Sequence, residues 1–342
     1  MKKLVRCFVI VVAIYQLSWG YVEERVVKGT AVKMVRMPLD SVQVIVGLAR
    51  GKVGATETLE GIAKRHGAVA AINGCFFDAY TSSPIKPPYH TIIVRGCLVH
   101  IGNVGTLLGF DQRGNYRMER VRITINGKVN HKQKWWLRNW HAYFVNHPPN
   151  MKNASILFNR HWCQSATPNT GTQIVIENGK VTNIGKGSKS IPENGFVLLL
   201  LGSEEAMAKR FRIGSTVRFK IDFTGGDPKF WSSVQEAIGC GPRLVANGEI
   251  VVNPTSEGFS HPKILSMSMA RSAVGITRLR EIMFVTCREA TVKKMAEIMK
   301  ELGAYDAMNL DGGASSGLWF RGRYLTTPGR LISNALLLVE KR

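Results

Sequence analysis

Short apolar runs, separated by glycines and polar residues, dominate the chain. Alternation of apolar with polar residues, or a brief continuous apolar run, is typical of strands, whose successive side chains face opposite sides of a sheet. Between residues 91 and 128 such runs are punctuated by glycines, which predicts a meander of strands. We expect further strands over residues 26–35, 41–48, 68–72, 172–177, 195–201, 216–223, 271–276, 281–286, 318–324 and 335–339.

Helical periodicity is clear in two segments. A short helix over Leu59–Arg65 can be capped by Thr56 or Thr58, because a threonine hydroxyl satisfies a free amide at a helix start. The apolar residues of Glu289–Leu302 recur at helical spacing, and Gly303 supplies the stop. The pattern therefore predicts an α+β fold: one strand-rich domain with mixed or antiparallel sheets and few helices.

The N-terminus resembles a secretory signal. Met1–Arg6 is basic, Cys7–Leu17 is apolar, and small residues near position 20 offer a cleavage site. We therefore expect a signal peptide over residues 1–20, or an uncleaved N-terminal anchor, followed by one domain over residues 21–342. The expected location is exported: periplasmic, in the cell envelope, or secreted.

The charge of the chain is strongly positive, +22, and removing the three cations of residues 1–20 leaves +19. Such an excess favours anionic partners such as phosphorylated glycans, acidic polymers or a membrane surface. An exported protein seldom meets nucleic acid, so we expect no nucleic-acid partner. The alternative interpretation is a generally basic protein with solvated faces.

A segment at about 131–165 is rich in both aromatic and basic residues, and it interrupts the strand pattern. It could bind sugars or polyanions by stacking and charge, or form an irregular cap on the sheet. The segment contains Lys132, Lys134, Trp135, Trp136, Arg138, Trp140, His141, Tyr143, Phe144, Phe158, Arg160 and Trp162.

Five cysteines follow the predicted signal, widely spaced and without a C-x-x-C pair. One or two disulfides, or free buried thiols, fit this pattern equally, and a structural zinc site does not. The histidines are scattered and form no metal-binding motif. We therefore predict no metal site, and no cofactor can be identified from the sequence.

Asn309–Gly317 concentrates one carboxylate, one amide, two hydroxyls and several glycines, which makes it a candidate site loop. Gly313–Gly317 matches the G-x-S-x-G pattern of serine hydrolases. That motif requires a strand before it, a helix after it and a later histidine. Here the order of elements is reversed and no histidine follows His261. Ser315 is therefore expected to bond to backbone or ligand.

Other candidate site residues lie in three separate segments. Asn73 and Asp78 flank a polar turn after a buried strand, where they could line a cleft or only cap the turn. Arg243 follows a second glycine-rich segment and is either a phosphate ligand or merely exposed. Lys263 and Arg271 are cations of the kinds that bind phosphate as a point charge and as a bidentate fork, respectively.

Together and in this order, five motifs resemble the phosphodiester glycosidase family from about Val26 to the end of the chain. This family includes the lysosomal "uncovering enzyme" and many bacterial exported proteins often labelled exopolysaccharide-related. The resemblance implies the family fold. The motifs are Ala71–Asp78, Gly239–Gly248, Lys263 with Arg271–Ile276, Asn309–Gly313 and Arg330–Ala335.

Two departures from the family pattern stand out. Cys75 and Cys240 replace usual glycines beside presumed site motifs, so the resemblance suggests a Cys75–Cys240 disulfide as a hypothesis. The enlarged aromatic segment at 131–165 is expected to change the substrate rather than the chemistry.

The resemblance implies hydrolysis of a sugar-1-phosphodiester, or a related anionic glycan, at the anomeric carbon. Asp311 would serve as the carboxylate that an oxocarbenium-like transition state needs, and Lys263 and Arg271 would stabilise the phosphate leaving group. Asp78 and Glu249 are further candidate helpers. The residues expected to bind substrate are Asn73, Gly74, Asp78, Arg243, Asn309, Gly312, Gly313, Ser315 and Asn334.

Two other functions remain open at this point. One is a non-catalytic protein that binds glycans or anionic wall polymers through the aromatic basic segment, because a shared fold does not guarantee activity. The other is a phosphodiesterase that cleaves the P–O bond.

Overall fold

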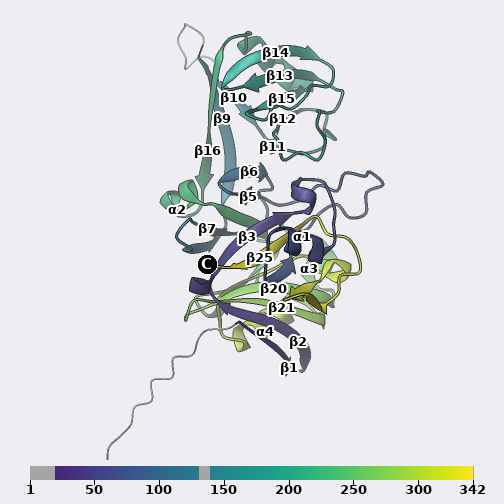
Figure 1. Cartoon of the computed structure of the whole chain (residues 1–342), viewed down its shortest axis with the longest axis vertical. Helices are drawn as coiled ribbons and strands as arrows, with labels where there is room; N and C mark the ends of the chain where they lie inside the picture. Colours follow the sequence, from purple (N-terminus) through teal and green to yellow (C-terminus); the bar gives the residue numbers. More distant parts are fainter. Residues whose placement is uncertain (1–19, 131–138, 342) are drawn as a thin grey trace, which may run out of the picture.

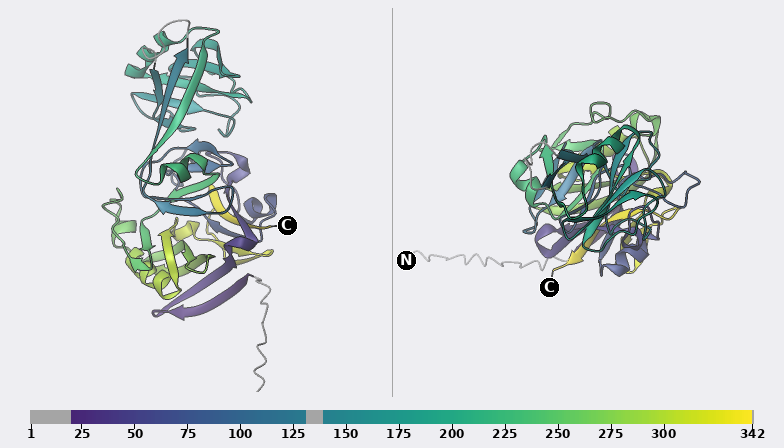
Figure 2. Two further views of the ribbon diagram at one scale, coloured as in Figure 1. Left: turned by 90° about the vertical axis from the view of Figure 1, so that its left-hand side faces the viewer. Right: turned by 90° about the horizontal axis from the view of Figure 1, so that it is seen from above.

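The computed structural model describes residues 20–130 and 139–341, so the predicted signal peptide lies outside the described residues except for Gly20. Figure 1 shows two parts stacked along the long axis. We call them the body, residues 20–121 and 225–341, and the lobe, residues 122–224. Figure 2 shows the same division from a second direction. No helix in the described part of the chain is long and apolar enough to cross a membrane.

The largest sheet of the body has seven strands in the order β1-β2-β21-β20-β22-β18-β19, all paired antiparallel. Helix α4 (Val292–Glu301) packs on it and buries Met295 and Met299 completely. The strands are β1 Tyr21–Val27, β2 Thr30–Pro38, β18 Arg243–Ala246, β19 Glu249–Ile250, β20 Met269–Thr277, β21 Glu281–Ala290 and β22 Ala304–Asn309.

Two five-stranded sheets complete the body, in the orders β24-β23-β4-β25-β3 and β6-β5-β17-β7-β8. Helix α1 (Leu59–Arg65) covers the first, and α2 (Pro228–Ser233) and α3 (Pro262–Leu265) are short. Their strands are β3 Val42–Leu48, β4 Ala70–Asn73, β23 Leu318–Phe320, β24 Arg323–Thr326, β25 Asn334–Glu340, β5 Ile92–Val94, β6 Cys97–His100, β7 Thr106–Phe110, β8 Tyr116–Glu119 and β17 Glu236–Cys240.

The lobe is one eight-stranded sheet in the order β10-β9-β16-β14-β13-β15-β12-β11, with a 3₁₀ segment over Gly202–Arg210. All its pairs are antiparallel except β11 with β12. Long strands β9 and β16 pair with each other and connect the lobe to the body (Figure 1). The strands are β9 Arg122–Asn130, β10 Asn139–Ala142, β11 Phe144–Val145, β12 Ala154–Phe158, β13 Thr172–Glu177, β14 Lys180–Lys186, β15 Gly195–Leu201 and β16 Thr216–Thr224.

The prediction of many strands and few helices is confirmed. For the residues that the structure describes, "mostly β" is a better fold class than α+β. Thr58, not Thr56, caps α1 through its hydroxyl. The predicted helix over Glu289–Leu302 begins later, at Val292, because β21 continues to Ala290 and Thr291 caps the helix. The strand expected at 26–35 is part of a hairpin that turns at Lys28-Gly29, where both residues have positive φ.

The aromatic segment at 131–165 is not a separate cap, because its described residues supply strands β10 to β12 of the lobe sheet. Trp140 and Trp162 are each 1% exposed and belong to hydrophobic cores. These two side chains therefore stabilise the fold and are closed to a ligand. Residues 131–138, with Trp135, Trp136 and three cations, lie outside the described residues.

The hypothetical Cys75–Cys240 disulfide is not formed, because both residues are free thiols. Both are buried, and burial raises the pKa of Cys75 to about 12 and that of Cys240 well above its usual value. The two thiols thus remain protonated and pack in the body core.

Candidate active site

Two segments far apart in sequence meet where β4 and β22 end, in different sheets of the body. The side-chain amide of Asn73 donates to the backbone carbonyl of Asp311 at 2.7 Å. The backbone amide of Asp311 donates to the carbonyl of Gly74 at 3.0 Å. These two bonds fix the Asp311 loop against the Asn73 turn.

Asn73 is almost fully buried and its side chain is fully engaged by protein groups. Its carbonyl oxygen accepts the Ser272 hydroxyl at 2.7 Å and the Gly317 amide at 3.0 Å. An amide so placed replaces backbone hydrogen bonds that loops cannot make. Asn73 therefore positions the loops.

Asn334 and Gly74 form a second support. The Asn334 side-chain oxygen accepts the amide of Cys75 at 2.8 Å, and its nitrogen donates to Ser333 at 2.7 Å. A Cβ on Gly74 would lie 2.0 Å from that oxygen, so only glycine fits there. Both residues act by shaping the turn.

Asn309 is likewise buried, and its side-chain nitrogen donates to the carbonyls of Gly241 and Leu310 at 3.0 and 2.8 Å. It connects the β22 end with the segment that follows β17. The three asparagines predicted to hold sugar hydroxyls thus all brace backbone around the loop that carries Asp311.

A cavity of about 560 Å³ opens beside this braced loop. It is lined by aromatic side chains and by charged groups of both signs. Its volume suits a small ligand such as a saccharide with a phosphate. The lining includes Phe76, Tyr80, Tyr89, His90, Phe259, His261, Lys263, Arg271, Asp311, Gly312, Gly313, Ser315 and Arg330.

Asp311 provides the one carboxylate among the described residues that line this cavity. Burial raises its pKa to about 6, although hydrogen bonds from the Ser315 hydroxyl and the Gly312 amide and the charges of Arg330 and Lys263 oppose the shift. A carboxylate in such a setting is ionised at neutral pH yet poorly hydrated. It is therefore a stronger nucleophile or base than an aspartate in water.

The glycines of the loop leave its backbone uncovered, so a ligand in the cavity can come close to it. Gly313 has φ +61°, which other residues rarely adopt. A Cβ on Gly312 would lie 2.7 Å from the carbonyl oxygen of Ala270. The loop therefore requires glycine at both positions.

Arg271 is fully buried at the cavity wall. Its Nε donates to the carbonyl of Ala290 at 3.0 Å, and its Nη2 donates to the carbonyls of Lys263 and Met267 at 2.6 and 2.7 Å. Its Nη1 has no partner among the described residues. Burial lowers the pKa of Arg271, yet a guanidinium stays charged, and its unpaired nitrogen is available to an anion.

Two further cations flank the cavity beside Tyr80. The Lys263 ammonium lies 5.0 Å from the centre of the Tyr80 ring, and Arg330 donates to the Tyr80 hydroxyl at 2.9 Å. Hydrogen bonding and charge from Arg330 lower the pKa of Tyr80. Tyr80 is 76% exposed, so this group lies at the solvent side of the cavity lining.

Besides the bracing residues Asn73, Gly74, Asn309 and Asn334, three further predicted residues do not line the cavity. Arg243 pairs with Asp306, its Nη2 2.5 Å from the carboxylate oxygen. Glu249 is exposed and pairs with Lys300 at 2.6 Å. Asp78 accepts the amide of Thr81 at 3.2 Å and also hydrogen-bonds Tyr89, which places it behind the entrance rather than in it.

His90, Tyr80, Tyr89 and Arg330 line the cavity but were not predicted as site residues. His90 is 3% exposed, neither of its ring nitrogens has a partner among the described residues, and burial lowers its pKa to about 4. Only Arg330 carried a signal, because it opens the last of the five family-like motifs. The other three lie in irregular segments, where no periodicity marks them.

The described residues contain no group of three or more His, Cys, Asp or Glu side chains that could hold a metal ion. The charged side chains that line the cavity are those of Asp311, Lys263, Arg271 and Arg330. One carboxylate opposite several cations matches a substrate with an electrophilic centre next to an anionic group.

Comparisons with known proteins address the family and the fold. A family model described as phosphodiester glycosidase matches residues 170–339, a span that contains Lys263, Arg271 and Asp311. No curated protein sequence matches the chain.

Solved structures show the same fold. A hypothetical protein from Synechocystis has a TM-score of 0.80 and 21% identity, over 94% of this chain and 62% of that chain. This chain thus spans less than two thirds of that protein. A protein of Burkholderia pseudomallei K96243, described as exported, has a TM-score of 0.75 and 19% identity, over 91% of this chain and 74% of that chain. The catalytic domain of zebrafish N-acetylglucosamine-1-phosphodiester alpha-N-acetylglucosaminidase has a TM-score of only 0.49 and 15% identity, over 95% and 83%, too low to support an argument.

Proposed function

We propose that the chain, whose residues 170–339 match the family model described as phosphodiester glycosidase, hydrolyses a sugar-1-phosphodiester at the anomeric carbon. The products are a free sugar and a phosphomonoester. The single observation that carries this proposal is the Asp311 carboxylate, with its pKa raised to about 6, facing a cavity that Lys263, Arg271 and Arg330 also line.

The proposed reaction breaks the bond between C1 and the phosphate oxygen. Asp311 stabilises the positive charge that develops at C1, and the electron pair of the broken bond leaves with the phosphate oxygen. Water then supplies the hydroxyl to C1 and releases a proton. Lys263, Arg330 and the free Nη1 of Arg271 stabilise the leaving phosphate, whose charge grows as the bond breaks.

The nature of the leaving group explains why one carboxylate suffices. Ordinary glycosidases need a second, protonated carboxyl because a sugar alkoxide is a poor leaving group. A phosphomonoester is stable as an anion at neutral pH, so cations can replace the acid. The cavity supports this reading because, among its described residues, it offers one carboxylate and three permanent cations.

The aromatic wall suits the sugar. Phe76, Phe259 and His90 pack edge-to-face with centres 5.4 to 6.2 Å apart. Such a wall provides an apolar surface for a sugar face. The unpaired ring nitrogens of His90, which lines the cavity, provide hydrogen bonds to the sugar.

Export is part of the proposal. It rests on the signal-like residues 1–20 and on the likeness to the Burkholderia protein described as exported. Periplasmic, cell-envelope and secreted locations all fit a substrate drawn from anionic surface glycans, and contact with a membrane surface suits the net charge of +22.

Hydrolysis of a panel of sugar-1-phosphodiesters in ¹⁸O-water tests the proposal. Label in the released sugar is the expected result, because water attacks C1. Label in the phosphate would assign P–O cleavage instead. No turnover with any member of the panel, including envelope polymers, would leave a glycan-binding protein.

A further inference from the structure

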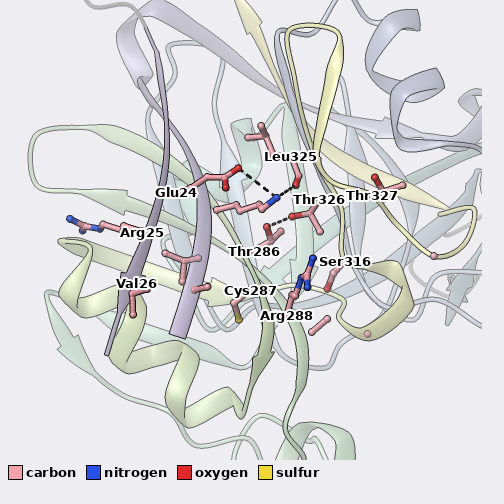
Figure 3. A pocket seen from close by; sticks show the side chains of 16 residues that line it. Glu24, Arg25, Val26, Thr286, Cys287, Arg288, Ser316, Leu325, Thr326 and Thr327 are labelled. Carbon is pink, nitrogen blue, oxygen red and sulfur yellow. Dashed lines mark hydrogen bonds and ion pairs between the residues drawn. The ribbon is translucent and has the colours of Figure 1, made fainter. Parts of the chain in front are cut away.

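A second pocket, of about 710 Å³, lies on the side of the Gly313–Ser316 turn away from the candidate active site. Figure 3 shows it between the β1–β2 hairpin, the end of β21 and the β24 strand. Gly313 lines both this pocket and the active-site cavity. The two therefore share a wall, which is the turn that follows Asp311.

Positive charge dominates the second pocket. Arg288 is exposed, forms no ion pair among the described residues, and points into the pocket toward Ser316 (Figure 3). The Lys33 ammonium lies 3.5 Å from the Glu24 carboxylate and donates to the carbonyl of Leu325 at 2.7 Å. Arg25 pairs with Glu23 at 3.1 Å and points away from the other lining residues (Figure 3).

Hydroxyl groups line the same pocket beside the cations. Ser316 is 3% exposed, and its hydroxyl has no hydrogen-bond partner among the described residues. A buried hydroxyl without a partner is costly, which indicates that a ligand or water completes it. Thr286 and Thr326 share a hydrogen bond of 2.7 Å and also face the pocket.

We propose that this pocket binds an anionic sugar unit of the substrate, the repeat next to the one that is cleaved. The inference rests on the proposed function and narrows its substrate class to a chain with repeated phosphodiesters. Arg288 and Lys33 hold the phosphate of that unit, and the hydroxyls of Ser316 and Thr326 bond its sugar oxygens. Because Gly313 lines both pockets, the two units would lie on either side of this residue.

The chemistry of the pocket favours this ligand over a purely apolar one or a free ion. A free cation beside an unpaired hydroxyl matches a phosphate attached to hydroxyl-bearing carbons. The volume of about 710 Å³ greatly exceeds that of a single phosphate and fits a saccharide unit.

Calorimetric binding to the full chain in the Asp311→Asn background, which prevents cleavage, tests the inference. The probes are hexamers of glucose, mannose and N-acetylglucosamine 1-phosphate, and the matching single-repeat methyl diesters. Arg288→Gln removes the free cation of the pocket. Arg278→Gln is the matched control, because Arg278 lies in the turn at the opposite end of the same β20–β21 hairpin, stacked on Tyr305.

We expect Arg288→Gln to weaken binding of a hexamer about tenfold, the value of one charge-assisted hydrogen bond, and to leave the single-repeat diester unchanged. Ser316→Ala should weaken the hexamer by about threefold, and Arg278→Gln should change neither probe. The inference would be overturned if Arg288→Gln weakened binding of the hexamer and of the single-repeat diester equally, or weakened neither. It would also be overturned if the parent protein bound no hexamer.

Two further experiments distinguish this inference from membrane binding and from the proposed hydrolytic activity. Arg288-dependent binding of phosphatidylglycerol vesicles without hexamer binding would overturn it in favour of a membrane surface. The wild-type protein is assayed for hydrolysis of the same panel. Hexamer binding that depends on Arg288, without hydrolysis, would support the pocket and contradict the proposed activity. Hydrolysis with hexamer binding that does not depend on Arg288 would support the proposed activity and overturn the pocket.

Discussion

The body and the lobe both contain groups that, in the sequence, were candidates for ligand contacts, but they use them differently. In the lobe, Trp140 packs against Phe196, Phe211 and Phe219 with ring centres 5.7 to 6.4 Å apart. In the body, charged and aromatic side chains line a cavity, and buried amides brace the loops beside it. In the lobe, the described tryptophans of the segment 131–165 form part of hydrophobic cores. In the body, the asparagines next to glycines brace the loops of the candidate site.

The difference has a physical origin. A tryptophan is stabilised by any apolar surroundings, so its position in a sequence does not distinguish a core from a binding platform. A buried asparagine is tolerated only where defined partners satisfy its amide. Asn73, Asn309 and Asn334 lie at the ends of β4, β22 and β25, where their side-chain amides bond to neighbouring loops.

The largest effect that we expect is on catalysis in the body. Asp311→Asn keeps the shape of the side chain but removes the charge, and kcat/KM should fall on the order of 10³ to 10⁴-fold. Steady-state kinetics on the best diester of the panel measures it. Asp78→Asn, at the neighbouring turn, serves as control and should cost less than about tenfold. Near-normal turnover by a folded Asp311→Asn protein would sink the assignment.

The next effect concerns the stability of the lobe. Trp140→Ala removes a buried indole, 1% exposed, and should lower the free energy of unfolding by about 3–5 kcal/mol, because the cavity cannot collapse completely. Denaturant unfolding gives this value. Tyr143→Ala, at a 52% exposed position, should cost less than about 1 kcal/mol. If Trp140→Ala abolished activity in protein that stays folded, the assignment of Trp140 to a purely structural role in the lobe would be wrong.

A third effect links the site to stability through pH. The pKa of Asp311 is raised from 3.8 to about 6, so between these values the folded state binds more protons than the unfolded state. Its contribution to stability is therefore present below pH 4 and lost as pH rises through 6. Asp311→Asn should stabilise the protein at pH 7 by at most about 3 kcal/mol, and not at pH 3.5.

Comparing the free energy of unfolding of the wild-type protein with that of Asp311→Asn at each pH isolates the contribution of the Asp311 carboxyl. Glu236 also has a pKa raised by burial, to about 7, and contributes with the same sign between 4.5 and 7. That contribution cancels because both proteins contain it. A gain from Asp311→Asn that does not vary with pH would show that the carboxyl is not desolvated.

The smallest effect separates two cations of the body. Lys263→Met should lower kcat/KM by about 10- to 100-fold with little change in stability, because a transition-state cation is lost. Arg243→Met should instead destabilise by about 1–3 kcal/mol and leave KM unchanged, because it strands the Asp306 carboxylate. Kinetics and unfolding on both variants decide it, and the reversed pattern would restore Arg243 to the site.

Much of this organisation was predictable from the sequence. Alternation revealed most strands of the body, and helical spacing revealed α1 and α4, because burial on one face enforces these periods. In the lobe it revealed β9, β13, β15 and β16 but missed β10, β11, β12 and β14. The sequence also picked out Asp311, Lys263 and Arg271, which the fold brings to one cavity.

What the sequence could not show was orientation and long-range pairing. Residue type alone does not reveal that Asn309 points at the Gly241 carbonyl, or that Arg243 meets Asp306 sixty-three positions later. Tyr80 and His90 lie in a segment without periodicity, so only the folded chain brings them to the cavity. The turn at Lys28-Gly29 was missed because a lysine at positive φ carries no sequence signal.

The connection between the two parts has a consequence for evolution and engineering. Arg122 at the start of β9 pairs with Thr224 at the end of β16, so the chain leaves and re-enters the body at neighbouring points. A region inserted in this way can be exchanged without changing the path of the chain through the body, which contains the candidate site. A graft at this junction would need to cover Ile93, Leu98 and Leu107, which share the lobe core. Lobes of other shapes could thus give one cavity access to different glycans.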